Sequence, residues 1–203
     1  HPAFGDQNAW HLAVKAMARL HACTAGFIPE IVPPSRLYLS NWPAIWSRKI
    51  SELCDFYRRQ QKLNRKTPFI RLFLETFQSV KTTMEKNMPL LEGITAFSVI
   101  PGAFCHHDLS ERNMLIGAND RFFLLDWENG LFDFPMHDLL HLTVYHLFAA
   151  PPEKWRSLAR KITGLYHEVN PLSDKERRLL YILSLWPQKY WRIVQQYMKK
   201  EPL

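Results

Sequence analysis

Glycine is scarce in this chain of 203 residues, with seven in all and no two close enough to form a loop that cradles phosphates. The three cysteines, Cys23, Cys54 and Cys105, are far apart and form no Cys-x-x-Cys pair. Neither a disulfide framework nor a cysteine zinc site is therefore indicated. No run of about 18 uninterrupted apolar residues occurs, so we expect no membrane-spanning helix and no membrane partner.

Acidic residues are the minority charge, with 19 Asp and Glu against 26 Lys and Arg and a net charge of +7. This surplus favours an anionic ligand, such as a nucleotide or an acidic glycan, over a cationic one. The charges are scattered over helical segments, where a solvated helix face is the ordinary interpretation. No nucleic-acid-binding motif occurs, so we expect no nucleic-acid partner. The cysteine usage predicts a reducing, cytoplasmic location.

Apolar residues make up 47% of the chain, enough for a real core, and we predict one mainly helical (α+β) domain over residues 1–203. Apolar spacing typical of helices, together with caps and prolines, predicts a helix that begins at Ala9 and ends before Gly26, and helices over 46–64 and 67–84. It also predicts helices opened by Pro135 and by Pro152, and a last helical region capped by Ser173 and broken or kinked at Pro187. The proline-rich stretch 27–43 is expected to be an extended connection, and 89–102 a short helix and loop.

One β-hairpin is predicted between residues 113 and 126. Met114-Leu115-Ile116 and Phe122-Phe123-Leu124-Leu125 have the composition of buried strands, and 117–121 supplies turn residues between them. Asn113 and Asp126 then flank the open end of the hairpin. A loop containing His106 and Asp108 precedes it, so we expect Asp108, Asn113 and Asp126 to come together.

These three residue types suit phosphoryl transfer from a nucleotide. That reaction needs oxygen ligands for Mg²⁺ and one carboxylate that orients and deprotonates the attacking hydroxyl. Mg²⁺ prefers oxygen ligands and retains several waters, so the Asn113 amide and the Asp126 carboxylate can suffice alongside the phosphates. Asp108, on the loop before the hairpin, is the candidate base. An isolated Asp or Asn near a turn is more often a turn former or cap.

A family resemblance follows from these motifs. His106-His107-Asp108-Leu109-Ser110-Glu111-Arg112-Asn113-Met114-Leu115, with Leu124-Leu125-Asp126-Trp127-Glu128, resembles the catalytic and metal-binding segments of the aminoglycoside phosphotransferase and choline kinase group, which has a protein-kinase-like fold. The segments 132–139 and 37–46 most resemble its bacterial spore-coat-associated branch. The resemblance implies a kinase-like C-terminal lobe, which is a helical bundle whose hairpin carries the site. It also implies ATP and Mg²⁺ as partners, and association with the spore.

The activity that this resemblance implies is phosphoryl transfer from ATP to a hydroxyl of a small molecule or sugar. The group also places a phosphate cover and a phosphate-binding cation on an N-terminal sheet, and this chain shows neither. The first residues resemble neither a signal peptide nor a natural start. We therefore expect a C-terminal lobe whose N-terminal nucleotide-binding lobe is absent from this chain, and an isolated chain that is inactive.

Asp138 and His106 are expected to support the site rather than react. Asp138 falls in the first turn of the helix opened by Pro135, where a carboxylate is favoured by the helix dipole and can accept from unpaired backbone N–H groups. In the proteins that the chain resembles, such a carboxylate holds the catalytic loop and the loop histidine packs behind it. The expectation for this chain is an Asp138 oxygen within about 3.2 Å of a backbone nitrogen of residues 106–108.

Two alternatives remain open at this point. The first is a kinase-shaped binding or spore-coat assembly module without catalysis, for which the aromatic content of 13% provides contact surface. The second is a metal-dependent His-Asp phosphohydrolase, with His106, His107-Asp108, His137-Asp138 and His141 as candidate ligands. In that second case Asn113 has no function.

Overall fold

The computed structural model describes residues 7–27, 42–97, 100–117 and 121–200. The chain divides into two compact units, which are treated separately below. Unit 1 comprises His1–Leu39 and Ser98–Leu180, and unit 2 comprises Ser40–Phe97 and Tyr181–Leu203. The single domain expected over the whole chain stays a prediction. Most of the expected proline-rich connection, 28–41, lies outside the described residues.

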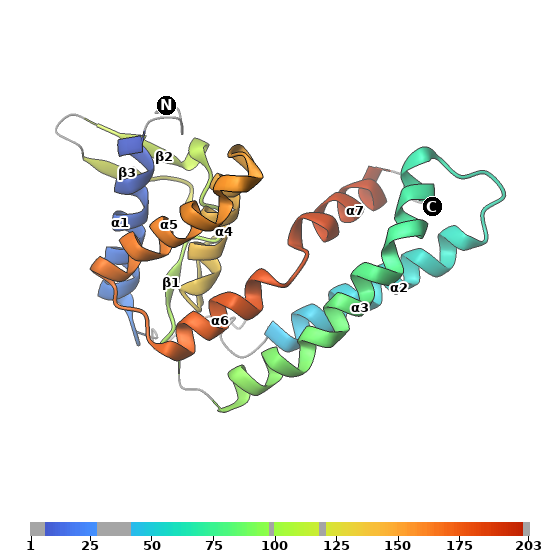
Figure 1. The fold of residues 1–203 in the computed structure, drawn as a ribbon, viewed down its shortest axis with the longest axis horizontal. Coiled ribbons are helices and arrows are strands. Elements are labelled where there is room, and N and C mark those ends of the chain that lie inside the picture. The colour runs from blue at the N-terminus through green and yellow to red at the C-terminus, as the bar shows by residue number, and fades with distance from the viewer. Residues whose placement is uncertain (1–6, 28–41, 98–99, 118–120, 201–203) are drawn as a thin grey trace. The chain divides into compact units, whose positions relative to one another are not determined.

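Three helices and two strand pairs make up most of unit 1: α1 (Gln7–Thr24), α4 (Met136–Ala149) and α5 (Trp155–Val169), with β1 (Ala103–Cys105), β2 (Met114–Ile116), β3 (Phe122–Leu124) and β4 (Leu131–Asp133). Helix α1 packs against α5 and β1, and α4 packs against α5 (Figure 1). The helical spacing predicted for the α1 segment includes Ala13 and Met17, which are buried in this core, and Val14, outside that spacing, is buried as well. Gly26 follows α1 with φ +72°, which favours glycine.

The predicted hairpin is present, with β2 antiparallel to β3 and Met114 opposite Leu124. Both strands were expected to be buried. This expectation is wrong for the face of the hairpin that carries Leu115 and Phe123. Leu115 and Phe123 form a cross-strand pair and are both exposed. A two-stranded ribbon has two faces, and in the described residues only the face that carries Met114 is covered.

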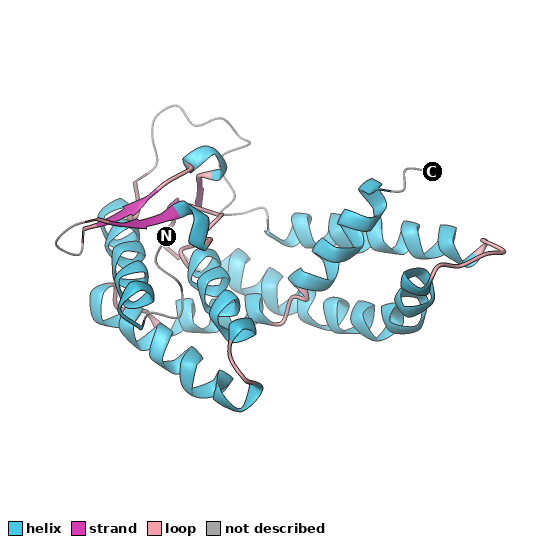
Figure 2. Cartoon of the chain, turned by 90° about the horizontal axis from the view of Figure 1, so that it is seen from above, coloured by secondary structure: helices cyan, strands magenta, loops and turns pink. Residues whose placement is uncertain are grey.

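A second strand pair was missed by the sequence analysis. β1 pairs antiparallel with β4, with Ala103 opposite Asp133 and Cys105 opposite Leu131. Each of these strands has three residues, too few for an alternating pattern to stand out. Figure 2 shows the strands of the described chain in magenta and its helices in cyan. The pair is nonetheless central to the site, because β1 leads into the loop of His106 and Asp108, and β4 leads into α4.

Unit 2 is helical in its described part, with α2 (Trp42–Gln61), α3 (Pro68–Phe97), α7 (Gln188–Lys200) and the end of α6 (Asp174–Ser184). Helix α3 corrects the sequence prediction, because it continues through Pro89 and Gly93 where a short helix and loop were expected. Leu91 and Ile94 are buried in continuation of the apolar face that carries Met84. This packing outweighs the local cost of proline and glycine in a helix.

Two expected features of the C-terminal helices are confirmed. In the capping box before α6, Ser173 Oγ accepts from Glu176 N at 3.3 Å, and Ser173 N donates to Glu176 Oε2 at 2.8 Å. Pro187 separates α6 from α7. In the part of the chain that the structure describes, no helix is both long enough and apolar enough to span a membrane.

Candidate active site

The Asp138 carboxylate holds the loop that carries Asp108. Asp138 lies in the first turn of α4 and is fully buried. Its Oδ2 accepts from His106 N at 2.6 Å, and its Oδ1 accepts from His107 N at 2.9 Å. The distance expected from the sequence is therefore confirmed. Two backbone donors that no strand ladder satisfies are paired with one carboxylate, whose negative charge strengthens both bonds.

Burial alone raises the pKa of the Asp138 carboxyl, but hydrogen bonding from His137 and His21 and electrostatic attraction to His21 and His107 hold this pKa well below its usual value. The two backbone N–H groups add to the same stabilisation of the charged form. Asp138 is thus a carboxylate at neutral pH and acts only as an acceptor. This is the arrangement needed to fix a loop, and it leaves no proton on Asp138 to donate.

His106 connects the Asp108 loop to the hairpin. Its ring is fully buried, Nδ1 accepts from Asp108 N at 3.2 Å, and Nε2 lies 2.7 Å from the Leu125 carbonyl oxygen. Because Nδ1 accepts a backbone N–H, the ring proton is on Nε2 and is donated to Leu125 O. One imidazole therefore fixes the backbone at Asp108 and the backbone next to Asp126.

Asp108 and Asn113 are in direct contact. The Asn113 side-chain nitrogen donates to Asp108 Oδ2 at 3.0 Å and to the Asp108 carbonyl oxygen at 2.9 Å. Asn113 ends a 3₁₀ turn, Glu111–Asn113, and is buried, whereas Asp108 is half-buried. Since the amide nitrogen is committed to Asp108, the amide oxygen is the Asn113 atom left for a cation.

Asp126 lies at the open end of the hairpin opposite Asn113. Leu125 N donates to Asn113 O at 2.8 Å, which extends the β2–β3 ladder and places Asp126 next to Asn113 in the fold. Asp126 is exposed and precedes the 3₁₀ turn Trp127–Asn129. The structure therefore brings Asp108, Asn113 and the backbone of Asp126 together, as the spacing predicts.

Two non-glycine residues of the described chain have positive φ: His107 at 64° and Asp126 at 61°. Both lie at this site, one beside the candidate base and one at the candidate metal ligand. Left-handed backbone is uncommon for residues other than glycine and persists where surrounding contacts enforce it. Here the enforcing contacts include the bond from His107 N to Asp138 and the His106–Leu125 bond beside Asp126.

Two clusters of potential metal ligands lie behind the loop. In the first, His107 Nε2 is 3.1 Å from Asp133 Oδ2, and the rings of His107 and His137 stack at 4.2 Å with an interplanar angle of 20°. Nitrogen lone pairs lie in the ring plane, so two nearly parallel rings do not direct them at one ion. His141 is 6.5 Å from His137 between ring centroids. This arrangement does not favour the phosphohydrolase alternative.

The second cluster contains His21, Cys105 and Asp138, all buried. His21 Nδ1 lies 2.9 Å from Tyr166 Oη, and its Nε2 lies 3.4 Å from Asp138 Oδ2, so both ring nitrogens have partners. Burial raises the pKa of the Cys105 thiol, which therefore stays protonated and is a poor ligand. The cluster is best understood as the support of Asp138.

His21, Asp133 and Tyr166 were not identified as site residues from the sequence. His21 lies four residues after Met17 on the buried face of α1, and that position was the available signal. Nothing in the sequence connects it with Asp138, which is 117 residues further on. Asp133 is placed by β4, a strand that the sequence analysis missed, and its Oδ1 accepts from Phe134 N at 2.8 Å.

The fold is that of the aminoglycoside phosphotransferases, a protein-kinase-like fold. An aminoglycoside phosphotransferase from Alicyclobacillus acidocaldarius matches with a TM-score of 0.76 and 18% identity, over 94% of this chain and 56% of that one. A spectinomycin phosphotransferase solved with ADP and spectinomycin matches with a TM-score of 0.52 and 15% identity, over 89% of this chain and 53% of that one.

The family model described as "Spore coat putative kinase YutH" matches residues 5–202, and the chain belongs to this family. Among curated proteins, the endospore coat-associated protein YutH of Bacillus subtilis is 25% identical over 186 residues. That match covers 89% of this chain and 52% of the relative. The chain thus spans about half the length of the relative and of the solved structures that it resembles.

Proposed function

We propose that this chain is the C-terminal lobe of a phosphotransferase that moves the γ-phosphoryl group of ATP to a hydroxyl of a small molecule or sugar. The observation that carries the proposal is the Asp108–Asn113 contact of 3.0 Å, on a loop held by Asp138 and beside Asp126. A carboxylate fixed next to two oxygen ligands is what this chemistry requires. The family and the shared fold support the same conclusion.

Asp108 is the proposed base. The acceptor oxygen attacks the γ-phosphorus, the bond from that phosphorus to the bridging oxygen breaks, and ADP leaves with the electron pair. Asp108 receives the acceptor proton as the new O–P bond forms. Its half-buried position and the bond from Asn113 fix the carboxylate orientation before the acceptor arrives.

Asn113 and Asp126 suit Mg²⁺ by the chemistry of their donor atoms, an amide oxygen and a carboxylate. When bound with the nucleotide, Mg²⁺ neutralises negative charge on the phosphates. The chain contributes position: the Asn113 nitrogen is anchored on Asp108, and His106 holds the backbone before Asp126. Asp138 and His106 therefore position the reacting residues and do not touch the substrate.

A second lobe, supplied by a longer protein, completes the proposed site. The chain spans 52% of its curated relative, which leaves room for such a lobe in that protein. The described hairpin also presents an uncovered apolar face, with Leu115 37%, Phe123 48% and Leu125 39% exposed. An uncovered apolar face beside a site is typical of a surface that another domain covers. Association with the spore is proposed from the coat-associated relative.

The test uses the complete parent protein and two variants. Asp108→Asn should lower turnover of ATP with hydroxyl acceptors about 10² to 10⁴-fold and leave Mg-nucleotide affinity nearly unchanged. Asp126→Ala should instead weaken Mg-ADP binding in calorimetry. Glu153→Gln, an exposed change elsewhere in unit 1, is the control. Full activity of both variants, or a folded wild type that binds no nucleotide, would contradict the proposal and favour the non-catalytic coat-assembly module.

A further inference from the structure

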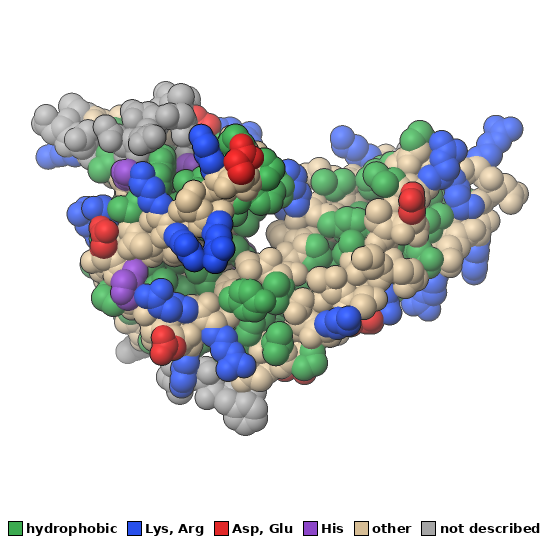
Figure 3. Space-filling view, in the orientation of Figure 1, with side chains coloured by type: hydrophobic (Ala, Val, Ile, Leu, Met, Phe, Trp, Pro, Cys, Tyr) green, Lys and Arg blue, Asp and Glu red, His purple; other side chains and the backbone are tan. Residues whose placement is uncertain are grey.

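The positive charge of this protein is concentrated in unit 2. The described residues of unit 2 contain fourteen Lys and Arg against five Asp and Glu, whereas those of unit 1 contain eleven against ten. Three of the five acids of unit 2 pair within their own helix: Glu52 with Arg48, Asp55 with Arg58, and Glu85 with Lys81. These pairs remove three cations and three acids, so the surplus in the described residues of unit 2 stays at nine positive charges. On the face drawn in Figure 3, Lys and Arg side chains (blue) outnumber Asp and Glu (red).

Much of this surplus gathers where the turn between α2 and α3 meets the last turn of α7. Thr67 Oγ1 lies 3.0 Å from Tyr197 Oη, and the rings of Phe69 and Tyr197 stack at 4.2 Å. Five exposed cations lie on the segments that flank these contacts, the end of α2 with the turn after it and the end of α7, and we call them the basic end: Arg59, Lys62, Arg65, Lys199 and Lys200. Cations in the last turn of a helix are favoured by the helix dipole. This does not account for Lys62 and Arg65, because both lie outside the helices.

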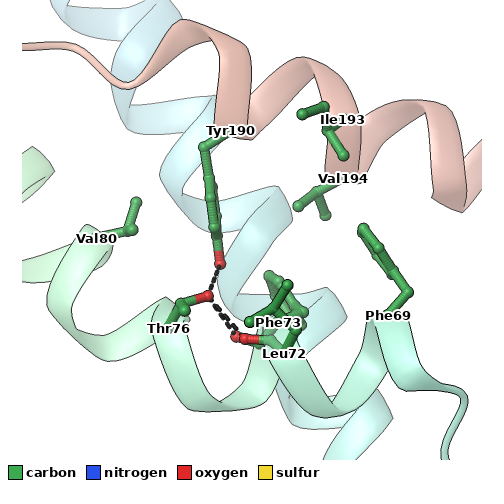
Figure 4. Close-up of a pocket in the computed structure, with 8 residues that line it drawn as sticks. All are labelled: Phe69, Leu72, Phe73, Thr76, Val80, Tyr190, Ile193 and Val194. Atoms are coloured by element: carbon green, nitrogen blue, oxygen red, sulfur yellow. Dashed lines mark hydrogen bonds between the residues drawn. The ribbon is translucent and has the colours of Figure 1, made fainter. Parts of the chain in front are cut away.

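An apolar groove leads to the basic end. The groove has a volume of about 340 Å³ and is lined by α3 and α7 (Figure 4). Its lining residues are Phe69, Leu72, Phe73, Thr76, Val80, Tyr190, Ile193 and Val194. Leu72 is 59% exposed and Ile193 46% exposed, one on each wall. Phe69 belongs to the groove and also stacks on Tyr197, so the groove and the basic end are continuous.

We infer that the groove and the basic end together bind an acidic amphipathic helix of a partner protein. An amphipathic helix places apolar residues at i, i+3, i+4 and i+7 into such a groove, and here these would cover Leu72 and Ile193. Acidic residues at one end of the helix would meet the basic end, which supplies charge complementarity. A nucleic acid or an acidic glycan would satisfy the charges but leave the apolar walls uncovered.

This inference does not depend on phosphoryl transfer, because it rests on unit 2 alone. The test is a selection from a display library of helical peptides with randomised apolar, acidic and basic positions, carried out against the 203-residue chain. The expected result is enrichment of peptides with apolar residues at helical spacing and Asp or Glu at one end. A selection that enriches nothing, or that enriches peptides without acidic residues, overturns the inference.

Variants then locate the binding of the enriched peptides. Leu72→Ser with Ile193→Ser, and separately Lys199→Glu with Lys200→Glu, should each weaken binding at least about tenfold, as interface centres and charge pairs commonly do. Leu90→Ser with Lys86→Glu is the matched control, because both residues are exposed on α3 and neither lines the groove. All positions are exposed, and circular dichroism verifies folding. Equal loss in the control, or binding matched by poly-glutamate or an oligonucleotide, overturns the inference.

Discussion

A single buried carboxylate, Asp138, determines the conformation of the loop that carries Asp108. Replacing it by alanine leaves the His106 and His107 amides without their acceptor, and the His21 Nε2 atom loses its contact with Asp138. Unpaired buried donors cost about 1 to 3 kcal/mol each, so Asp138→Ala should lower the free energy of unfolding by about 3 kcal/mol. Urea denaturation of the 203-residue chain measures this.

The control for this prediction is Asp55→Ala. Asp55 is exposed and bonds Arg58 at 2.6 Å on the surface of α2, an interaction worth little to stability. We expect its loss to change the unfolding free energy by less than about 0.5 kcal/mol. An Asp138→Ala protein as stable as Asp55→Ala would show that the carboxylate does not hold the loop.

His146 makes the stability of the protein dependent on pH. It lies in the last turn of α4 and is buried, and burial lowers its pKa from 6.5 to about 4. Between these two values the unfolded chain binds a proton that the folded chain does not, so stability falls as the pH drops from 6.5 towards 4. We expect the urea midpoint to fall from pH 7 to pH 5, and to fall less in His146→Gln. Equal pH dependence of the two proteins would contradict this assignment.

The turn before β4 has space for glycine alone. A Cβ added to Gly130 would lie 2.6 Å from Phe104 Cζ and 3.0 Å from the Trp127 carbonyl oxygen. Phe104 is fixed on β1, where it stacks on Trp127. Gly130→Ala should therefore separate β4 from β1 and cost about 1 to 3 kcal/mol of stability.

Gly164→Ala is the matched comparison for Gly130→Ala. Gly164 lies inside α5, and a Cβ there meets nothing within 4 Å. Alanine in a helix interior is favoured over glycine by about 0.5 to 1 kcal/mol, so we expect this variant to be more stable than the wild type. Thermal unfolding of the two variants should give shifts of opposite sign. Shifts of the same sign would mean that the contact with Phe104 does not govern the turn.

Features determined by nearby residues could be predicted from the sequence. The capping box at Ser173 depends on residues three apart, and the β2–β3 hairpin on a turn of a few residues between strand-like runs. The same locality allowed Asn113 and Asp126 to be placed at one end of the hairpin. The role of Asp138 was predicted from its place in the first turn of a helix, together with the role that such a carboxylate has in the proteins that the chain resembles.

Features determined by distant packing could not be predicted in the same way. Helix α3 passes through Pro89 because Leu91 and Ile94 are buried, and burial is a property of the fold. β1 and β4 pair across 28 residues at the register of Phe104 and Phe132, with too few residues for a pattern. Because β1 and β4 were not predicted, Asp133 was not recognised as a site residue.

The two units of the molecule differ in charge and in the sites that they contain. Unit 1 is nearly balanced in charge and contains every residue assigned to the candidate active site. Unit 2 contains the surplus of positive charge and the groove between α3 and α7. The proposed chemistry and the proposed partner binding can therefore be tested by separate variants, because no residue is shared between them.

The candidate site presents mainly oxygen atoms to a nucleotide. Asp108 and Asp126 are carboxylates, Asn113 offers an amide oxygen, and no cation is among the residues assigned to the site. A triphosphate meeting these groups without further cations is repelled, and Mg²⁺ held by two protein ligands compensates only in part. Phosphotransferases of this kind also need a cover and a cation on the phosphates, which we propose that a second lobe supplies.

We therefore predict that the 203-residue chain alone binds Mg-ATP weakly, with a Kd above about 1 mM, because each missing charge-assisted contact removes about 1.5 to 3 kcal/mol. Calorimetry on the chain and on the complete parent protein should differ by at least tenfold in affinity. Asp126→Ala should lower the affinity of the parent and leave the chain unchanged. Micromolar binding by the chain would show that the residues of unit 1 suffice, and that the phosphates are held by groups within the chain itself.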